Sequence, residues 1–146
     1  MRMRRHEIED FFLLILWSIW WGGLTFYAAA VVPIGTELLG SIDQGFITQR
    51  VTRWHNFLAG LLCISLLYIA RRDHNRILLI LSSILGLVAL ALVSWHIRLT
   101  SLMDFDSQIV PKGFYREHAV YLWLTTLEWI CGLIVPIFWS RPRASE

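Results

Sequence analysis

Four apolar runs, separated by charged or polar segments, make up most of the chain, and the fourth contains a single acidic residue, Glu128. About 20 apolar residues in a helix cross the roughly 30 Å hydrocarbon core of a bilayer, so each run predicts a transmembrane helix. The expected fold is all-α: one integral membrane domain, residues 1–146, folded as an antiparallel bundle of four transmembrane helices. The predicted helices cover residues 11–33, 54–70, 77–97 and 119–140.

The segment before the second span has the pattern of an amphipathic helix. Ser41 and Gln44 have the spacing of a capping box, in which the serine caps the helix start and the glutamine reaches back to it. Apolar residues then recur at helical intervals, at Ile47, Val51, Trp54 and Leu58. We therefore expect an amphipathic outer helix that leads into the second span.

The start of the chain also has features of a secretory signal, because basic residues precede an apolar run that ends in small residues. A signal core has about 7 to 15 apolar residues, and the first run is longer. In addition, Glu7, Glu9 and Asp10 interrupt the junction between the basic and apolar parts. An uncleaved first helix is the favoured interpretation.

Basic residues are distributed unequally between the two faces that four spans define. Eight lie on the side of the termini, and five lie on the other side, which together account for the 13 in the chain. The first group is Arg2, Arg4, Arg5, Arg71, Arg72, Arg76, Arg141 and Arg143, and the second is Arg50, Arg53, Arg98, Lys112 and Arg116. The positive-inside rule then predicts that both termini are cytoplasmic. We expect the membrane to be a bacterial-type inner (plasma) membrane.

Composition narrows the function classes. With 56% hydrophobic residues and a net charge of +2, the chain lacks the clustered basic face of a nucleic-acid-binding protein. The motifs GxSxG, GxxxxGK[ST], GxGxxG and HExxH are absent, which favours a non-enzymatic protein. Cys63 and Cys131 fall inside predicted spans without CxxC spacing and are expected to be small buried residues. The expected partners are the lipid bilayer and other membrane subunits or a second copy of the chain.

The fourth span contains a polar stripe whose members follow steps of three, four and three residues, which places them on one helical face. A charged side chain at mid-membrane is disfavoured by roughly 2.5 to 3.5 kcal/mol, so Glu128 is expected to face the bundle interior. The stripe is typical of a proton relay, and hydrogen bonding between packed helices is the alternative interpretation. Its residues are His118, Tyr121, Thr125 and Glu128.

The predicted topology places three of the five histidines, His55, His96 and His118, at the outer ends of the last three spans. Together they could bind copper or zinc, or two of them could ligate haem b. No local metal-binding motif such as HxxxH supports this interpretation, and histidines without a ligand or cofactor are the leading alternative. Carboxylates that could complete a metal shell are Glu37, Asp104, Asp106 and Glu117.

Packing residues lead to a second hypothesis. Small residues recur at helical spacing on the first three spans and predict buried faces there. Trp17, Trp20 and Trp21 are predicted to form part of a tryptophan-rich exterior against which partners pack. Under this hypothesis the chain is a non-enzymatic accessory or scaffold subunit. The competing hypothesis is a membrane protein that moves protons or binds a metal. The small residues are Ser18, Gly22, Thr25 and Ala29, then Asn56, Gly60 and Cys63, then Ser82, Gly86 and Ala89.

The first half of the chain resembles a known group of proteins. The segment from Gly23 to Pro33 contains Phe26 and ends in two valines and the proline, and the amphipathic segment then runs into Trp54, His55 and Asn56. This arrangement is similar to the small four-helix membrane proteins of unknown function grouped with copper-resistance-D-like proteins. The resemblance implies a four-helix bundle and metal handling at the outer face, with His55 as the one candidate ligand inside the matching stretch.

Overall fold

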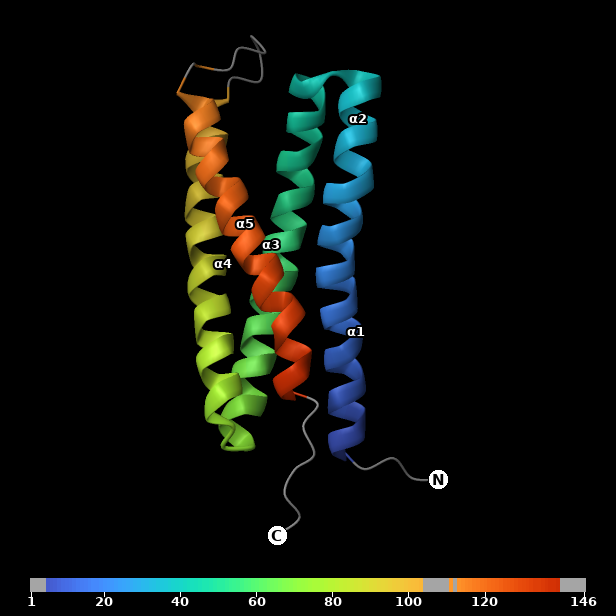
Figure 1. Cartoon of the computed structure of the whole chain (residues 1–146), viewed down its shortest axis with the longest axis vertical. Helices are drawn as coiled ribbons and strands as arrows, with labels where there is room; N and C mark the ends of the chain where they lie inside the picture. The colour runs from blue at the N-terminus through green and yellow to red at the C-terminus, as the bar shows by residue number, and fades with distance from the viewer. Residues whose placement is uncertain (1–4, 104–110, 112, 140–146) are drawn as a thin grey trace.

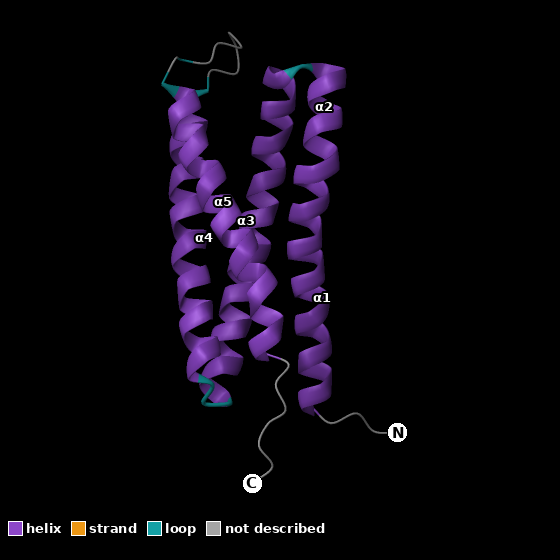
Figure 2. Cartoon of the chain, viewed as in Figure 1, coloured by secondary structure: helices purple, strands orange, loops and turns teal. Residues whose placement is uncertain are grey.

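The computed structural model describes residues 5–103, 111 and 113–139, and within these ranges every regular element is a helix (Figure 2). The all-α prediction is confirmed. Four helical stretches are long and apolar enough to cross a membrane: residues 7–39, Ser41–Arg72, Arg76–Leu102 and Phe114–Trp139. The elements are α1 (Arg5–Phe26), a π-helical segment η1 (Tyr27–Val31), α2 (Val32–Leu39), α3 (Ser41–Arg72), α4 (Arg76–Leu102) and α5 (Phe114–Trp139).

The helix α3 is longer than the predicted second span. It runs unbroken through 32 residues, or about 48 Å at ~1.5 Å per residue, so the amphipathic segment and the second apolar run are one helix. The prediction that a helix leads into this span is confirmed. The extension also changes the position of His55, which lies about 21 Å along the axis from Ser41 instead of at a helix end.

Pro33 explains the change of helix type in the first long stretch. A proline inside an α-helix lacks the backbone N–H and its ring clashes with the carbonyl four residues earlier. Here the chain widens into η1 just before Pro33, and the N–H of Val32 donates to the carbonyl of Tyr27, five residues back. The stretch therefore remains helical as far as Leu39, where Gly40, with φ of 86°, reverses the chain into α3.

The predicted capping box at the start of α3 is wrong. Ser41 is already a helical residue, and the preceding cap position, Gly40, makes no side-chain hydrogen bond. Gln44 instead points toward the first helical stretch, where its Nε2 donates to the hydroxyl of Tyr27 at 3.2 Å. The amide fits because Gly35 has no side chain: a Cβ there would lie 1.8 Å from Gln44 Oε1. Gln44 thus joins α2 and α3 side by side and is only 3% exposed.

Polar contacts tie the helix ends together at both ends of the molecule. At one end, Arg72 of α3 pairs with Glu9 of α1, and Asn75 Nδ2 donates to the carbonyl of Phe138 in α5 at 3.1 Å. At the other end, Gln49 Nε2 of α3 donates to Thr100 Oγ1 of α4 at 2.8 Å. The start of α1 and the end of α5 therefore lie at the same end of the molecule (Figure 1).

The buried core lies mainly between α3, α4 and α5, whereas α1 packs along one side of this group (Figure 1). Leucines of α3 and α4 and Val135 of α5 fill the core. The first helical stretch contributes few buried residues, among them Leu13 and Trp20. The fully buried leucines are Leu62, Leu66, Leu78, Leu85 and Leu92.

Tryptophans fill the interface between α1 and α5, so the prediction that Trp17, Trp20 and Trp21 form an exterior is wrong. Trp20 is fully buried, and Trp17 and Trp21 are stacked with ring centroids 5.5 Å apart. Pro136 gives the physical reason, because it lacks an N–H and leaves the carbonyl of Gly132 without its helical donor. Trp17 Nε1 donates to this carbonyl at 2.9 Å. The Trp17 indole N–H therefore satisfies a backbone carbonyl that lipid could not.

The predicted small-residue faces are buried only in part. Cys63, Ser82 and Ala89 are buried, whereas Ser18 and Ala29 are exposed. A close approach occurs instead at Gly132, where a Cβ would lie 2.7 Å from Trp20 Cζ3. The bulky rings of α1 thus pack directly on the backbone of α5, and this contact requires a glycine at position 132.

Candidate functional site

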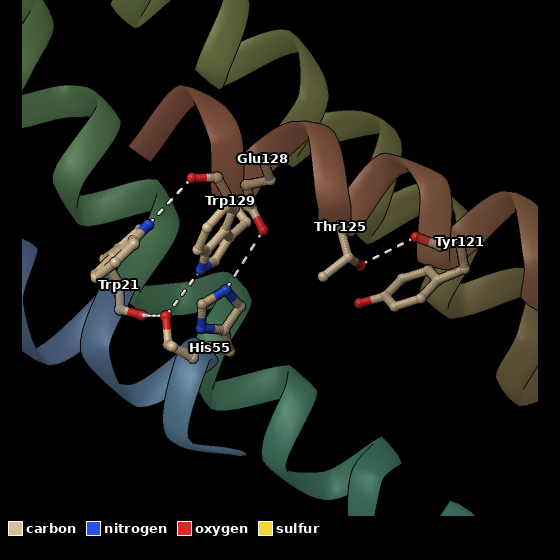
Figure 3. A network of polar contacts seen from close by, with 7 residues as sticks. Trp21, His55, Tyr121, Thr125, Glu128 and Trp129 are labelled. Atoms are coloured by element: carbon tan, nitrogen blue, oxygen red, sulfur yellow. Dashed lines mark hydrogen bonds and ion pairs between the residues drawn. The ribbon is translucent and has the colours of Figure 1, made fainter. Parts of the chain in front are cut away.

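Glu128 is fully buried at the middle of α5, which confirms that it faces the bundle interior. Its Oε2 lies 3.4 Å from Nε2 of His55 on α3, and Figure 3 shows the imidazole turned toward the carboxyl group. This separation is longer than the usual N–H···O distance of about 2.9 Å, so the pair is in contact without forming a short hydrogen bond. A carboxyl group and an imidazole thus meet inside an otherwise apolar core.

The rest of the pair's surroundings is poor in polar partners. Glu128 Oε1 is buried and has no hydrogen-bond partner among the residues that the structure describes. The ring of Trp20 stacks on His55 with centroids 5.7 Å apart and an interplanar angle of 13°. Burial of an unpaired polar atom costs on the order of 1–3 kcal/mol. Glu128 therefore lowers the stability of the fold compared with an apolar side chain at the same position.

A second polar network lies next to the pair and connects α1 with α5. Trp21 Nε1 donates to the carbonyl of Trp129 at 3.1 Å, and Trp129 Nε1 donates to Thr25 Oγ1 at 2.8 Å (Figure 3). The Thr25 hydroxyl in turn donates to the carbonyl of Trp21 at 2.8 Å. These bonds fix the rotation of α5 against α1, which holds the neighbouring Glu128 toward α3.

The predicted polar stripe on α5 lies inside the molecule but does not form a continuous hydrogen-bonded chain. Thr125 Oγ1 donates to the carbonyl of Tyr121 at 3.0 Å, as helical threonines commonly do, and within the described part of the chain it makes no bond to Glu128. The Tyr121 hydroxyl lies near the hydroxyl groups of Thr52 and Thr125. Tyr121 is also within electrostatic range of Glu128, so the stripe leads to the carboxyl group without bonding to it.

A cavity of about 320 Å³ lies beyond Tyr121, between α2, α3, α4 and α5. Residues of every neighbouring helix line it, and among the lining residues that the structure describes none is Asp, Glu, Lys or Arg. His55 and Glu128 are not among the lining residues, so Tyr121 is the stripe residue that lies between this cavity and the pair. Its polar lining includes Gln49, Thr52, Thr100, His96, His118 and Tyr121.

The structure separates the three histidines into two places. His96 and His118 line the cavity, and His118 stacks on Phe114 with centroids 5.5 Å apart. His55 lies with Glu128 and Trp20, because α3 begins before the predicted span and carries His55 to mid-helix. The prediction that His55 lies at the outer end of its helix is wrong.

A metal site built from all three histidines is not supported. Within the described residues, no group of three or more His, Cys, Asp or Glu side chains could hold a metal ion. Glu117 pairs with Arg98, with Oε1 2.9 Å from Nη2, and Glu37 is exposed on α2. Asp104 and Asp106 lie outside the described residues.

The thiols of Cys63 and Cys131 are free and buried, as expected for small residues of the core. Both lie within electrostatic range of Glu128, one on α3 and one on α5. They add bulk beside the carboxyl group and supply no strong hydrogen-bond donor to its unpartnered oxygen.

The contact between His55 and Glu128 is the feature of the candidate site that the sequence did not reveal. The predicted second span begins at residue 54, which places His55 at its outer end and Glu128 deeper in the bundle. The true start of α3 at Ser41 can be recognised in the sequence only once Gly40 is identified as the end of the preceding helix. A glycine that separates two helical patterns was the available signal.

The fold and the site together define a class: an all-helical protein with four candidate membrane spans and a carboxyl–imidazole pair in its core. No family model, curated protein or solved structure matches the chain. The resemblance to copper-resistance-D-like proteins stays a prediction.

Proposed function

We propose that this chain is an integral membrane protein whose four long helices form an antiparallel bundle across the bilayer. Large apolar side chains on the outside support this proposal, for example Leu38 and Trp123, each 75% exposed. Lipid covers such a surface without cost, whereas water does not. The count of basic residues places the start of α1 and the end of α5 on the cytoplasmic side, and the cavity then lies toward the opposite side.

We further propose that the His55–Glu128 pair takes up and releases protons within this bundle. The observation that carries the proposal is the complete burial of Glu128 with one carboxyl oxygen unpartnered in the described structure. Such a group is costly in a membrane interior and typical of proton pathways. One proton shared between the carboxyl and the imidazole leaves the pair neutral overall, whichever group holds it, so the pair can store a proton without a buried net charge.

The cavity supports this function because it is a route for protons from one face. The lining is mostly apolar, but its polar side chains, among them Gln49, Thr100 and His96, can hold waters that carry protons as far as Tyr121, which lies between the cavity and the pair. The hydroxyl groups of Tyr121, Thr52 and Thr125 then lie close to one another on the path toward Glu128. Exchange of protons between the pair and the outer face follows this route.

Proton flux into vesicles tests the proposal. The full-length protein is reconstituted into liposomes that contain a pH-sensitive dye, and a potassium diffusion potential drives proton entry. We expect flux above that of empty vesicles, and we expect Glu128→Gln to remove it, because an amide of equal size cannot exchange a proton. Infrared spectra of the same samples should show a pH-dependent carboxyl band that Glu128→Gln lacks, which reports protonation even where no net flux occurs.

Glu117→Gln is the matched control, because Glu117 is a second carboxylate on α5 that pairs with Arg98 outside the proposed route. Its flux should equal that of the wild type. Circular dichroism and gel filtration must show the same folded protein for both variants. Unchanged flux and an unchanged carboxyl band in Glu128→Gln would refute the proton function.

A non-enzymatic accessory or scaffold subunit is the second candidate. The long apolar stretch that contains α1 favours it, because only 11% of its most apolar window is buried within this chain. This side of the bundle has room for another membrane subunit or a second copy of the chain as well as for lipid. A wild-type protein without flux or a pH-dependent carboxyl band would support this candidate over the proton function.

A further inference from the structure

The cavity beside Tyr121 has the chemistry of a binding site for a neutral molecule. Its lining contains no charged side chain among the described residues, and these residues therefore offer no counter-ion to an anionic or cationic ligand. Its volume of about 320 Å³ lies at the lower end of the roughly 300–1,000 Å³ range of small-molecule sites. A compact ligand that carries no net charge fits these properties.

Two imidazole rings in this cavity are available for hydrogen bonding. His96 on α4 and His118 on α5 both line it, and within the described residues neither ring makes a hydrogen bond to another group. The glutamines of the lining are different, since Gln49 is bonded to Thr100 and Gln44 to Tyr27. Two helices therefore each contribute to the same space one imidazole ring whose nitrogens have no hydrogen-bond partner among the described residues.

Aromatic rings form much of the α5 side of the cavity. Phe114, Tyr115 and Tyr121 line it together with His118, whose ring is stacked on Phe114 at an interplanar angle of 12°. Flat aromatic walls favour a flat ring in the ligand, because stacked rings exclude water and lose little conformational freedom. The lining thus selects for shape as well as for hydrogen bonding.

The rim of the cavity reaches the apolar outside of the bundle. Leu122 and Ile42 line the cavity and are also exposed, by 52% and 41%, and Tyr115 is 71% exposed. In the proposed bilayer these side chains face lipid near its outer surface. A molecule dissolved in the membrane therefore has access to the cavity from the side.

From these observations we propose that the cavity binds a lipid-soluble ligand whose head is a single neutral ring with two hydrogen-bonding oxygens, the chemistry of a quinone headgroup. His96 and His118 bond to its oxygens, and the aromatic side of α5 stacks on its ring. The proposal concerns binding only and goes beyond the proton function, because neither His55 nor Glu128 lines the cavity.

Calorimetric titration of the purified full-length protein in nanodiscs tests this inference. The probe is a decyl-substituted benzoquinone, and decylbenzene serves as a ring with the same tail but no oxygens. We expect saturable binding of the quinone to one site, and at least about tenfold weaker binding of decylbenzene, because two hydrogen bonds of about 1 kcal/mol each are lost. Equal binding of the two probes would mean that the cavity takes any apolar chain, and it would overturn the proposal.

Two substitutions locate the site. His118→Phe keeps a flat ring but removes both nitrogens, and it should weaken quinone binding about fivefold to tenfold. Gly45→Leu fills the cavity, since a Cβ at Gly45 has only Met103 Cε nearby, at 3.9 Å, and it should abolish binding. The matched control is Gly60→Leu on the same helix, where a Cβ meets nothing within 4 Å and which does not line the cavity.

Each outcome supports or overturns the proposal. Binding that is lost in Gly45→Leu but kept in Gly60→Leu supports it, and binding that both variants keep, or no saturable binding to the wild type, overturns it. Glu128→Gln separates this inference from the proton function: the variant should bind the quinone like the wild type whether or not it has lost proton flux.

Discussion

The hydrogen bond from Trp17 to the carbonyl of Gly132 should depend on Pro136. The proline removes the N–H that would otherwise bond to this carbonyl within α5, so the indole is its donor, at 2.9 Å. Trp17→Phe keeps an aromatic ring but leaves the carbonyl unpaired in an apolar environment. The loss of a partner from a buried acceptor costs about 1–3 kcal/mol, while interhelical hydrogen bonds in membranes average about 0.6 and reach about 1.7 kcal/mol. We expect the lost bond to reduce the free energy of unfolding by about 1 kcal/mol.

Pro136→Ala supplies a backbone N–H at position 136 that can bond to the same carbonyl. In this background the loss of the indole leaves nothing unpaired, so Trp17→Phe should be less destabilising by about 1 kcal/mol, a factor of roughly five in the unfolding constant. The assay is a double-mutant cycle in mixed micelles, with unfolding by dodecyl sulfate followed by circular dichroism. Only a coupling between the two substitutions of this sign agrees with the proposed cause.

Trp21→Phe is the matched control for this cycle. Trp21 Nε1 donates to the carbonyl of Trp129, which lies in a regular part of α5 and keeps its helical donor. Its effect on the free energy of unfolding should therefore add to that of Pro136→Ala. If Trp17→Phe were also additive with Pro136→Ala, the indole would not be replacing the missing N–H, and the explanation of the tryptophan-rich interface would fail.

Substitution by alanine should lower the free energy of unfolding at Gly132 and Gly40 but not at Gly86. Gly132→Ala places a Cβ 2.7 Å from Trp20 Cζ3 and should lower the free energy of unfolding by about 1–3 kcal/mol, whereas Gly86→Ala, with nothing within 4 Å, should be neutral or stabilising by up to about 1 kcal/mol in the same dodecyl sulfate titration. Equal effects would show that α1 and α5 do not pack this closely. Gly40→Ala should cost about 1–2 kcal/mol, because φ of 86° is unfavourable for a side chain, and a neutral result would contradict this turn geometry.

Much of the fold was predictable because it depends on local properties of the chain. Apolar runs of sufficient length form helices that are apolar enough to span a membrane, and the periodicity of Ile47 and Val51 correctly predicted that a helix precedes the second run. The helix bounds were less predictable. Charged residues at the end of an apolar run, such as Arg53, indicate where the apolar run ends, but they do not end the helix itself.

The candidate site was predictable only in part. The burial of Glu128 followed from the cost of exposing a carboxyl group to lipid, a property of one residue in its surroundings. Its contact with His55 did not follow, because that contact depends on how far α3 is shifted along its axis relative to α5. The wrong position of His55 also produced the unsupported prediction of a metal site with His96 and His118.

The sequence alone determined that the chain is helical, which four stretches could cross a membrane, and that Glu128 has to be enclosed, because each of these depends on hydrophobicity and spacing along the chain. The tertiary structure alone decided which side chains meet: His55 with Glu128, Trp17 with the carbonyl of Gly132, and His96 with His118 around one cavity. The reason is that the rotation and axial shift of each helix result from the packing of all the helices together, and no local pattern contains them.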